Sequence, residues 1–157
     1  MYQYTSEEGS DPLFTFTTKN GLSYFVAFRK LDFGLDYFQN LYSVDFWEIY
    51  NQTFIKDTSI EKTIIAILFS FFENHPNTIL HYVCDSIDFR QNARSKLFEM
   101  WYNNSKNNEF SKLDLTYSIE KEEIEYKLEF VFKNEFYDIN TVKENVIIQL
   151  NEFSTFK

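Results

Sequence analysis

One stretch of the sequence, residues 79–102, constrains the fold more than any other. It opens with a short apolar run rich in β-branched and aromatic residues, Ile79-Leu80-His81-Tyr82-Val83-Cys84. Such a run is typical of a strand that is covered on both faces. A polar corner follows, in which Asp88 and Gln91 have the spacing of the capping box that begins a helix. The stretch therefore predicts a central strand that leads through a corner into a helix.

The predicted helix carries two arginines on its inward side. At 3.6 residues per turn, Arg90 and Arg94 fall on the same stripe as Leu97 and Trp101. Arginine is seldom buried without a partner, because removing its charge from water is costly. Arg90 also lies in the first turn, where the helix dipole disfavours a cation. A negatively charged group should therefore lie close to both side chains.

Two hypotheses account for the arginine pair. In the first, the arginines form internal salt bridges with Asp85, Asp88 or a carboxylate elsewhere in the chain. In the second, the corner binds an anion through two guanidinium groups and the free N–H groups of the helix N-terminus. The ligand-binding candidates in that case are Arg90, Arg94, Asp85, Asp88 and Ser86. The sequence favours the salt bridge and leaves the anion site open.

Composition limits the class of protein. With 157 residues, 44% of them hydrophobic and 25% charged, the chain predicts one globular domain over residues 1–157. A net charge of −9 disfavours binding to duplex nucleic acid through its phosphates and to anionic membranes. Cys84 is the single cysteine and lies in the predicted buried strand, as expected for a reduced thiol. With no signal peptide and no apolar run long enough to cross a membrane, we expect a cytoplasmic protein.

Alternating apolar residues predict the remaining strands. They cover residues 2–5, 13–19, 22–29, 41–50, 113–119 and 124–132. Asn20-Gly21 suits a type I′ turn between the second and third strands. A two-residue turn would place Phe16 opposite Phe25 rather than Tyr24, so the loop length stays open. Charged residues alternate along the last strand and predict a solvated outer face that includes Glu129.

Two further helices are predicted. The first covers residues 58–74, with Thr58 and Glu61 as its capping box and His75-Pro76 at its end. Its apolar stripe is unusually wide, so the helix either packs inside the protein or contacts a partner, including a second copy. The second helix begins at Thr141. The fold class is therefore α+β, with antiparallel strands at both ends, a central strand-helix-strand-helix segment, and about seven strands and three helices, the helices on one face of the sheet.

Searches for catalytic patterns find no known signature. The three glycines are scattered, which excludes a glycine-rich nucleotide loop. His75 and His81 do not have the spacing of a helical metal pair, so neither a metal nor a cofactor is expected. We interpret His81 as a core histidine whose hydrogen bonds are satisfied.

The segment from Cys84 to Trp101 resembles a motif in a family of small uncharacterised Bacteroidota proteins. The shared residues follow the pattern C-D-S-x-D-x-R-x-x-A-R-x-x-L-F-x-x-W. The preceding helix and the N-terminal hairpin are similar too, so the likeness covers most of the chain. The family is a domain of unknown function. The resemblance implies a bacterial cytosolic protein and identifies no catalytic residue.

Together these features favour a non-enzymatic regulatory or protein-interaction protein. Its size and acidity suggest an accessory module of a bacterium, such as a defence or toxin–antitoxin module. The alternative is a small enzyme with a phosphate-bearing substrate, or a nucleotide-sensing module, that uses the corner from Asp85 to Arg94.

Overall fold

The computed structural model describes residues 1–7, 9, 11–32, 34–48, 57–84, 91–104, 109–119 and 124–155. These residues form one seven-stranded sheet and three α-helices, which confirms the predicted α+β class. The strands are β1 (Tyr4–Glu7), β2 (Leu13–Thr17), β3 (Ser23–Lys30), β4 (Leu41–Glu48), β5 (Ile79–Cys84), β6 (Phe110–Ile119) and β7 (Ile124–Lys133). The helices are α1 (Thr58–Asn74), α2 (Gln91–Asn104) and α3 (Ile139–Thr155), with a short 3-10 helix η1 (Asp36–Phe38).

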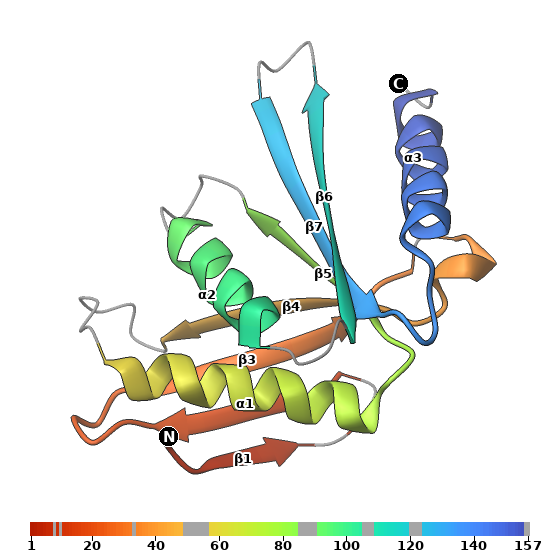
Figure 1. Cartoon of the computed structure of the whole chain (residues 1–157). Coiled ribbons are helices and arrows are strands. Elements are labelled where there is room, and N and C mark those ends of the chain that lie inside the picture. The colour runs from red at the N-terminus through yellow and green to blue at the C-terminus, as the bar shows by residue number, and fades with distance from the viewer. Residues whose placement is uncertain are drawn as a thin grey trace.

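The strands follow the order β1-β2-β3-β4-β5-β7-β6 across the sheet (Figure 1). All neighbours are antiparallel except β4 and β5, which run parallel and are joined through α1. A parallel pair needs such a crossover, because the chain must return from the end of one strand to the opposite edge of the sheet, where the other strand begins. The predicted central strand-helix-strand-helix segment therefore corresponds to β4, α1, β5 and α2.

The turn between β2 and β3, whose length the sequence left open, is longer than a two-residue type I′ turn. Phe16 pairs with Tyr24, and Thr18 donates its N–H to the carbonyl of Leu22 at 2.8 Å. Three residues therefore form the loop, and its last residue, Gly21, has a φ of +81°. Glycine adopts this left-handed conformation without a steric penalty, which lets the three-residue loop close.

The helices lie on both faces of the sheet, contrary to the expected single face. Alternate residues of a strand point to opposite faces, and Leu80 packs in the core under α1 and α2, whereas Ile79 packs with Val142 and Val146 of α3. Helices α1 and α2 cover the first face over most of the sheet (Figure 1). Val142 and Val146 are one helical turn apart in the sequence, but this spacing does not show the face of the sheet against which they pack.

The wide apolar stripe of α1 packs within the chain. Phe69, at its margin, lies 5.9 Å from the Trp101 ring and 6.4 Å from the Phe110 ring, centroid to centroid. Phe72 is 1% exposed and stacks on Trp101 at 5.5 Å. The core interpretation of this helix is thus confirmed, and its width reflects contact with the sheet, α2 and β6 together.

Aspartates that precede the predicted caps begin two of the helices. Asp57, rather than Thr58, caps α1 by accepting the N–H of Ser59 at 2.9 Å. Asp138 accepts the N–H of Thr141 at 3.1 Å, so α3 begins before that threonine. Both carboxylates supply an acceptor to an otherwise unpaired N–H group of the first turn. Among the described helices, none is both long and apolar enough to cross a membrane.

Candidate functional site

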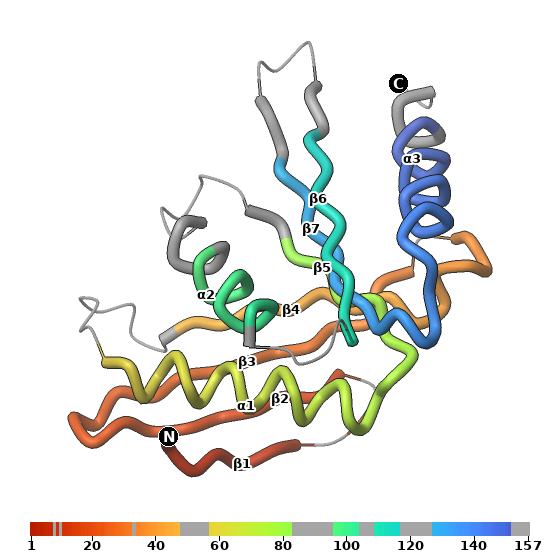
Figure 2. Tube along the Cα trace, in the orientation of Figure 1, coloured from red at the N-terminus to blue at the C-terminus, as the bar shows by residue number. Residues whose placement is uncertain are grey.

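Strands β4 and β5 pair over only three residues and then separate. The paired positions are Leu41 with Ile79, Tyr42 with Leu80, and Ser43 with His81. Beyond them, within the described part of the chain, no strand pairs with this side of 44–48 or of 82–84. We call this region the β4–β5 separation. Figure 2 traces the two strands side by side at one end and apart at the other.

The β4–β5 separation widens toward the C-terminal ends of the two strands. Helices α1 and α2, which follow β4 and β5 in the chain, both begin at that end. The N-terminus of α1 lies near the end of β4, and that of α2 near the end of β5 (Figure 1). The unpaired N–H groups of a helix N-terminus favour anions. Ligands of sheets with parallel strands commonly bind just beyond the carboxyl ends of those strands. This edge therefore combines two diverging strands with two helix N-termini.

The predicted anion corner falls largely outside the described residues. Asp85, Ser86, Asp88 and Arg90 belong to the undescribed segment 85–90, and the Arg94 side chain is likewise not described. Three later residues of α2 bear on the periodicity argument: Leu97, Phe98 and Trp101 are all at most 5% exposed. The inward stripe of α2 is thereby confirmed for these residues, and the two roles considered for the arginines remain predictions.

Glu129 is a buried carboxylate that the sequence analysis assigned to a solvated face. Its side chain is 0% exposed, and its Oε1 lies 3.6 Å from the ammonium of Lys112 and 3.5 Å from that of Lys127. Lys112 also lies 3.8 Å from a carboxylate oxygen of Asp114. Burial raises the pKa of Glu129 from 4.5 to about 7, so desolvation outweighs the attraction of the two lysines.

The position of β7 explains the burial of Glu129. The strand lies between β5 and β6, and Glu129 pairs with Tyr82 on one side and with Asp114 on the other. Its face of the sheet is the one that α1 and α2 cover. Alternation of charged and apolar residues predicts a solvated face only where no helix covers it, and the sequence of β7 gives no sign of that cover.

His81 is a core histidine, as predicted. It is 7% exposed, its ring stacks on Phe130 at 4.6 Å, and its Nδ1 lies 3.1 Å from the carbonyl oxygen of Glu129. Burial lowers the pKa of His81, which favours the neutral ring. Because His81 and Glu129 lie one position out of register, their side chains point to opposite faces and cannot act as a pair.

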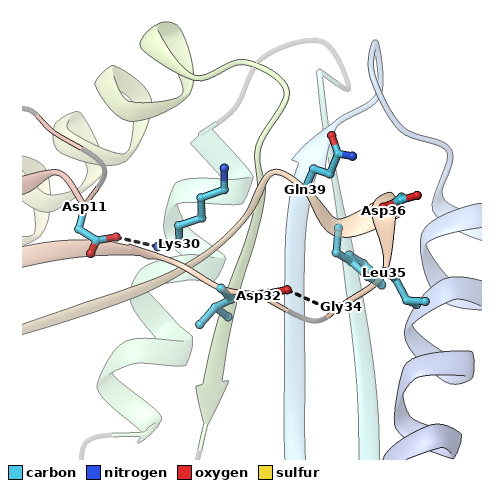
Figure 3. Close-up of a pocket in the computed structure, with 9 residues that line it drawn as sticks. Asp11, Lys30, Asp32, Gly34, Leu35, Asp36 and Gln39 are labelled. Carbon is cyan, nitrogen blue, oxygen red and sulfur yellow. Dashed lines mark hydrogen bonds between the residues drawn. The ribbon is translucent and has the colours of Figure 1, made fainter.

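A surface hollow of about 660 Å³ is lined by the loop between β3 and β4 (Figure 3). Three aspartates border it, but Asp11 accepts the backbone N–H of Lys30 and Asp32 accepts that of Gly34. These carboxylates therefore shape the loop. Throughout the described ranges, no cluster of three or more histidine, cysteine, aspartate or glutamate side chains could hold a metal ion.

Comparison with known families identifies one similarity. Residues 56–131 match the model of a family of unknown function, DUF6169. The match covers just under half of the chain and includes α1, β5, α2 and the residues of the predicted corner. The similarity supports an uncharacterised domain family and assigns no activity.

Comparisons with curated proteins and solved structures add little about activity. None of the curated proteins matches the chain. Among solved structures, the chain is similar to a crystal structure provisionally named as a phosphinothricin N-acetyltransferase. The two are 14% identical with a TM-score of 0.44, over 81% of this chain and 73% of the other. Similarity at this level leaves the function of the chain open.

Proposed function

We propose that the protein binds a phosphate-bearing small molecule whose extended arm lies in the β4–β5 separation. The observation that carries the proposal is the short parallel ladder, which stops after the pair of Ser43 and His81. An extended molecule that contains amides can lie between two diverging strands and hydrogen-bond to their backbone as an added strand would. Phosphopantetheine, a phosphate attached to a linear arm with two amides, has this chemistry.

The predicted corner would hold the phosphate. The chain from Cys84 at the end of β5 to Gln91 at the start of α2 contains Ser86 and Arg90, and Arg94 follows in the next turn. Paired guanidinium groups bind phosphate oxygens more strongly than neutral donors do, and lysine does not reproduce their planar geometry. The proposed role is that of a ligand-sensing regulatory protein in the bacterial cytoplasm.

Isothermal titration of the wild-type protein with three molecules tests the proposal. Phosphopantetheine should bind, whereas pantetheine, which lacks the phosphate, and inorganic phosphate, which lacks the arm, should each bind far more weakly. Arg94→Ala should weaken binding of phosphopantetheine by about 10- to 100-fold, the usual effect of losing a charged hydrogen bond. Arg29→Ala is the matched control, because Arg29 is an exposed arginine on β3. Equal binding by the two variants, or none by the wild type, would contradict the proposal.

A protein-interaction role is the second candidate, and exposed apolar side chains near α3 favour it. Phe136, Ile139, Ile147 and Ile148 are 45%, 38%, 42% and 49% exposed. Neighbouring exposed apolar side chains often mark a contact with another protein, and Ile147 and Ile148 are adjacent in α3. In a bacterial defence or toxin–antitoxin module, such a surface would contact the partner protein. Light scattering should then show association that Ile148→Glu abolishes, and a monomer at high concentration would argue against self-association.

A further inference from the structure

Strand β6, Phe110–Ile119, is an edge of the sheet, and within the described part of the chain no strand pairs with its outer side. Its ten residues pair with β7 in one continuous register, so the strand has no bulge, and it contains no proline. Proteins usually shorten or interrupt an edge strand, because its free backbone groups can pair with another chain. The other edge, β1, has only four residues. The long, regular edge of β6 is therefore a surface to which a further strand can add.

The outward backbone groups of β6 belong to its even-numbered residues. Asn134 donates its N–H to the carbonyl of Glu109 at 2.9 Å, directly across from it in the β6–β7 register. In an antiparallel pair, opposite residues exchange backbone hydrogen bonds at every second position. Odd-numbered residues such as Leu113 therefore bond to β7, whereas Lys112 and Asp114 direct their N–H and C=O groups away from the sheet.

The charges on this edge select the strand that can add. Lys112 and Asp114 lie on one face of β6, one residue to either side of Leu113, and their side chains are 16% and 52% exposed. If two copies of β6 pair antiparallel about a two-fold axis at Leu113, Lys112 of each copy lies opposite Asp114 of the other. An axis at Lys112 or at Asp114 would place like charges opposite each other, which destabilises a sheet. An axis at Ser111 or Leu115 would leave both charges without an opposite charge across the interface.

The apolar side of the same edge fits this axis. Leu113 is 6% exposed and belongs to the apolar cluster that includes Val142 of α3, and the partly buried Leu115 packs against that cluster. About an axis at Leu113, the two copies of this leucine are cross-strand neighbours, and each Leu115 lies diagonally next to Leu113 of the other copy. Pairing therefore joins the two apolar clusters while it pairs the charges on the other face.

We propose that the protein forms a homodimer in which two β6 strands pair antiparallel about a two-fold axis at Leu113. Such a contact uses the same surface of both copies and makes one continuous sheet of the two. Main-chain hydrogen bonds hold the strands together, and the pairs of Lys112 with Asp114 fix the register. The dimer does not depend on the proposed ligand, and its surface differs from the exposed side chains of α3.

Two charge reversals test the interface by light scattering and sedimentation equilibrium. Lys112→Glu and Asp114→Lys each place like charges opposite across the axis, so each variant alone should dimerise at least about tenfold more weakly than the wild type. An equimolar mixture of the two should dimerise again, because the new glutamate of one variant faces the new lysine of the other. Asp36→Lys makes the same charge change at an exposed position of η1 and should leave the wild-type dimer intact.

A cysteine pair tests the register without a charge change. Leu113→Cys should form a covalent dimer on mild oxidation, because residues opposite at a position without backbone bonds have Cα atoms about 4.5 Å apart, within disulfide range. Leu115→Cys should not, since it lies opposite Ser111 of the other copy. The wild type, whose single cysteine is Cys84, controls for oxidation at that position. This pair decides the question if Lys112→Glu fails to fold beside Glu129, 3.6 Å from the native ammonium.

Three results would overturn the proposal. The first is a wild type that stays monomeric at high concentration. The second is a dimer that both charge reversals leave intact, or that Leu113→Cys and Leu115→Cys cross-link equally. The third is a dimer that Ile148→Glu dissociates and Asp114→Lys does not, which would place the contact on α3.

Discussion

Replacing Glu129 with glutamine should remove a large part of the pH dependence of folding stability. The wild-type carboxyl has a pKa raised by burial from 4.5 to about 7, so the folded state holds a proton that the unfolded state releases. Its contribution to stability is therefore fully present below pH 4.5 and is lost as the pH rises through 7. Glutamine resembles the protonated form at every pH.

The size of the effect follows from the pKa. A displacement from 4.5 to about 7 corresponds to about 3 kcal/mol of free energy at alkaline pH. Residual solvent screening and the lysines near the carboxylate make this an upper limit. We therefore expect the free energy of unfolding of the wild type, relative to Glu129→Gln, to fall by about 1–3 kcal/mol between pH 4.5 and 8.

Comparing wild type with Glu129→Gln at each pH cancels the contribution of His81 to the pH dependence of stability, because both proteins contain this histidine. Its pKa is lowered by burial, so its stabilisation is present above the unfolded value of 6.5 and is lost as the pH falls, opposite in sign to that of Glu129. The backbone carbonyl at position 129 that contacts His81 is retained in the variant. Urea unfolding followed by circular dichroism at several pH values gives the difference directly.

A difference that stays level or grows as the pH rises would refute this reasoning, because the lysines would then hold Glu129 ionised. Glu135→Gln is the control, since it makes the same replacement at an exposed position in the turn after β7. Loss of stability by Glu129→Gln at every pH would show that the ion pairs, rather than desolvation, dominate at this position.

Two further predictions concern the helices. Asp57→Ala should lower the urea midpoint, because the N–H of Ser59 loses its acceptor and the hydroxyl of Tyr2 loses a carboxylate 2.5 Å away. The Tyr2 hydrogen bond lowers the pKa of Asp57, so this stabilisation is present above pH 3.8, and the difference from wild type should shrink below it. Trp101→Ala should cost about 3–5 kcal/mol, because it empties a fully buried site. Trp101→Phe should cost much less, since the lost indole N–H has no partner in the structure, and thermal melts of the two variants compare the costs.

The sequence allowed most elements to be predicted, because periodicity reports which residues of an element are buried. The alternation along β6 and β7 and the stripes of α1 and α2 all reflect contacts within or next to one element. The predicted bounds of α1, residues 58–74, are those of the structure, but the cap was assigned to Thr58 rather than Asp57, because both residues are good caps and only the backbone path selects between them.

The features that periodicity could not predict depend on long-range packing. Glu129 alternates with apolar neighbours like a solvated residue, yet β5, β6 and the helices enclose it. The face that α3 covers depends on the path of the turn after Lys133 rather than on the stripe of the helix. The candidate corner followed from helical periodicity and dipole arguments, and its segment 85–90 lies outside the described residues.

The three-residue parallel ladder also has a consequence for how the molecule opens. It is the only strand pairing, within the described ranges, between the antiparallel group β1–β4 and the antiparallel group β5–β7–β6. Each group is internally bonded along longer ladders, and the apolar clusters on the two faces of the sheet join the groups through side chains. Proteins with this organisation open in cooperative units whose free energies differ. Native-state amide hydrogen exchange should therefore resolve two sets of protected amides. The amides of the parallel ladder at Leu41–Ser43 should exchange whenever the less stable of the two units opens.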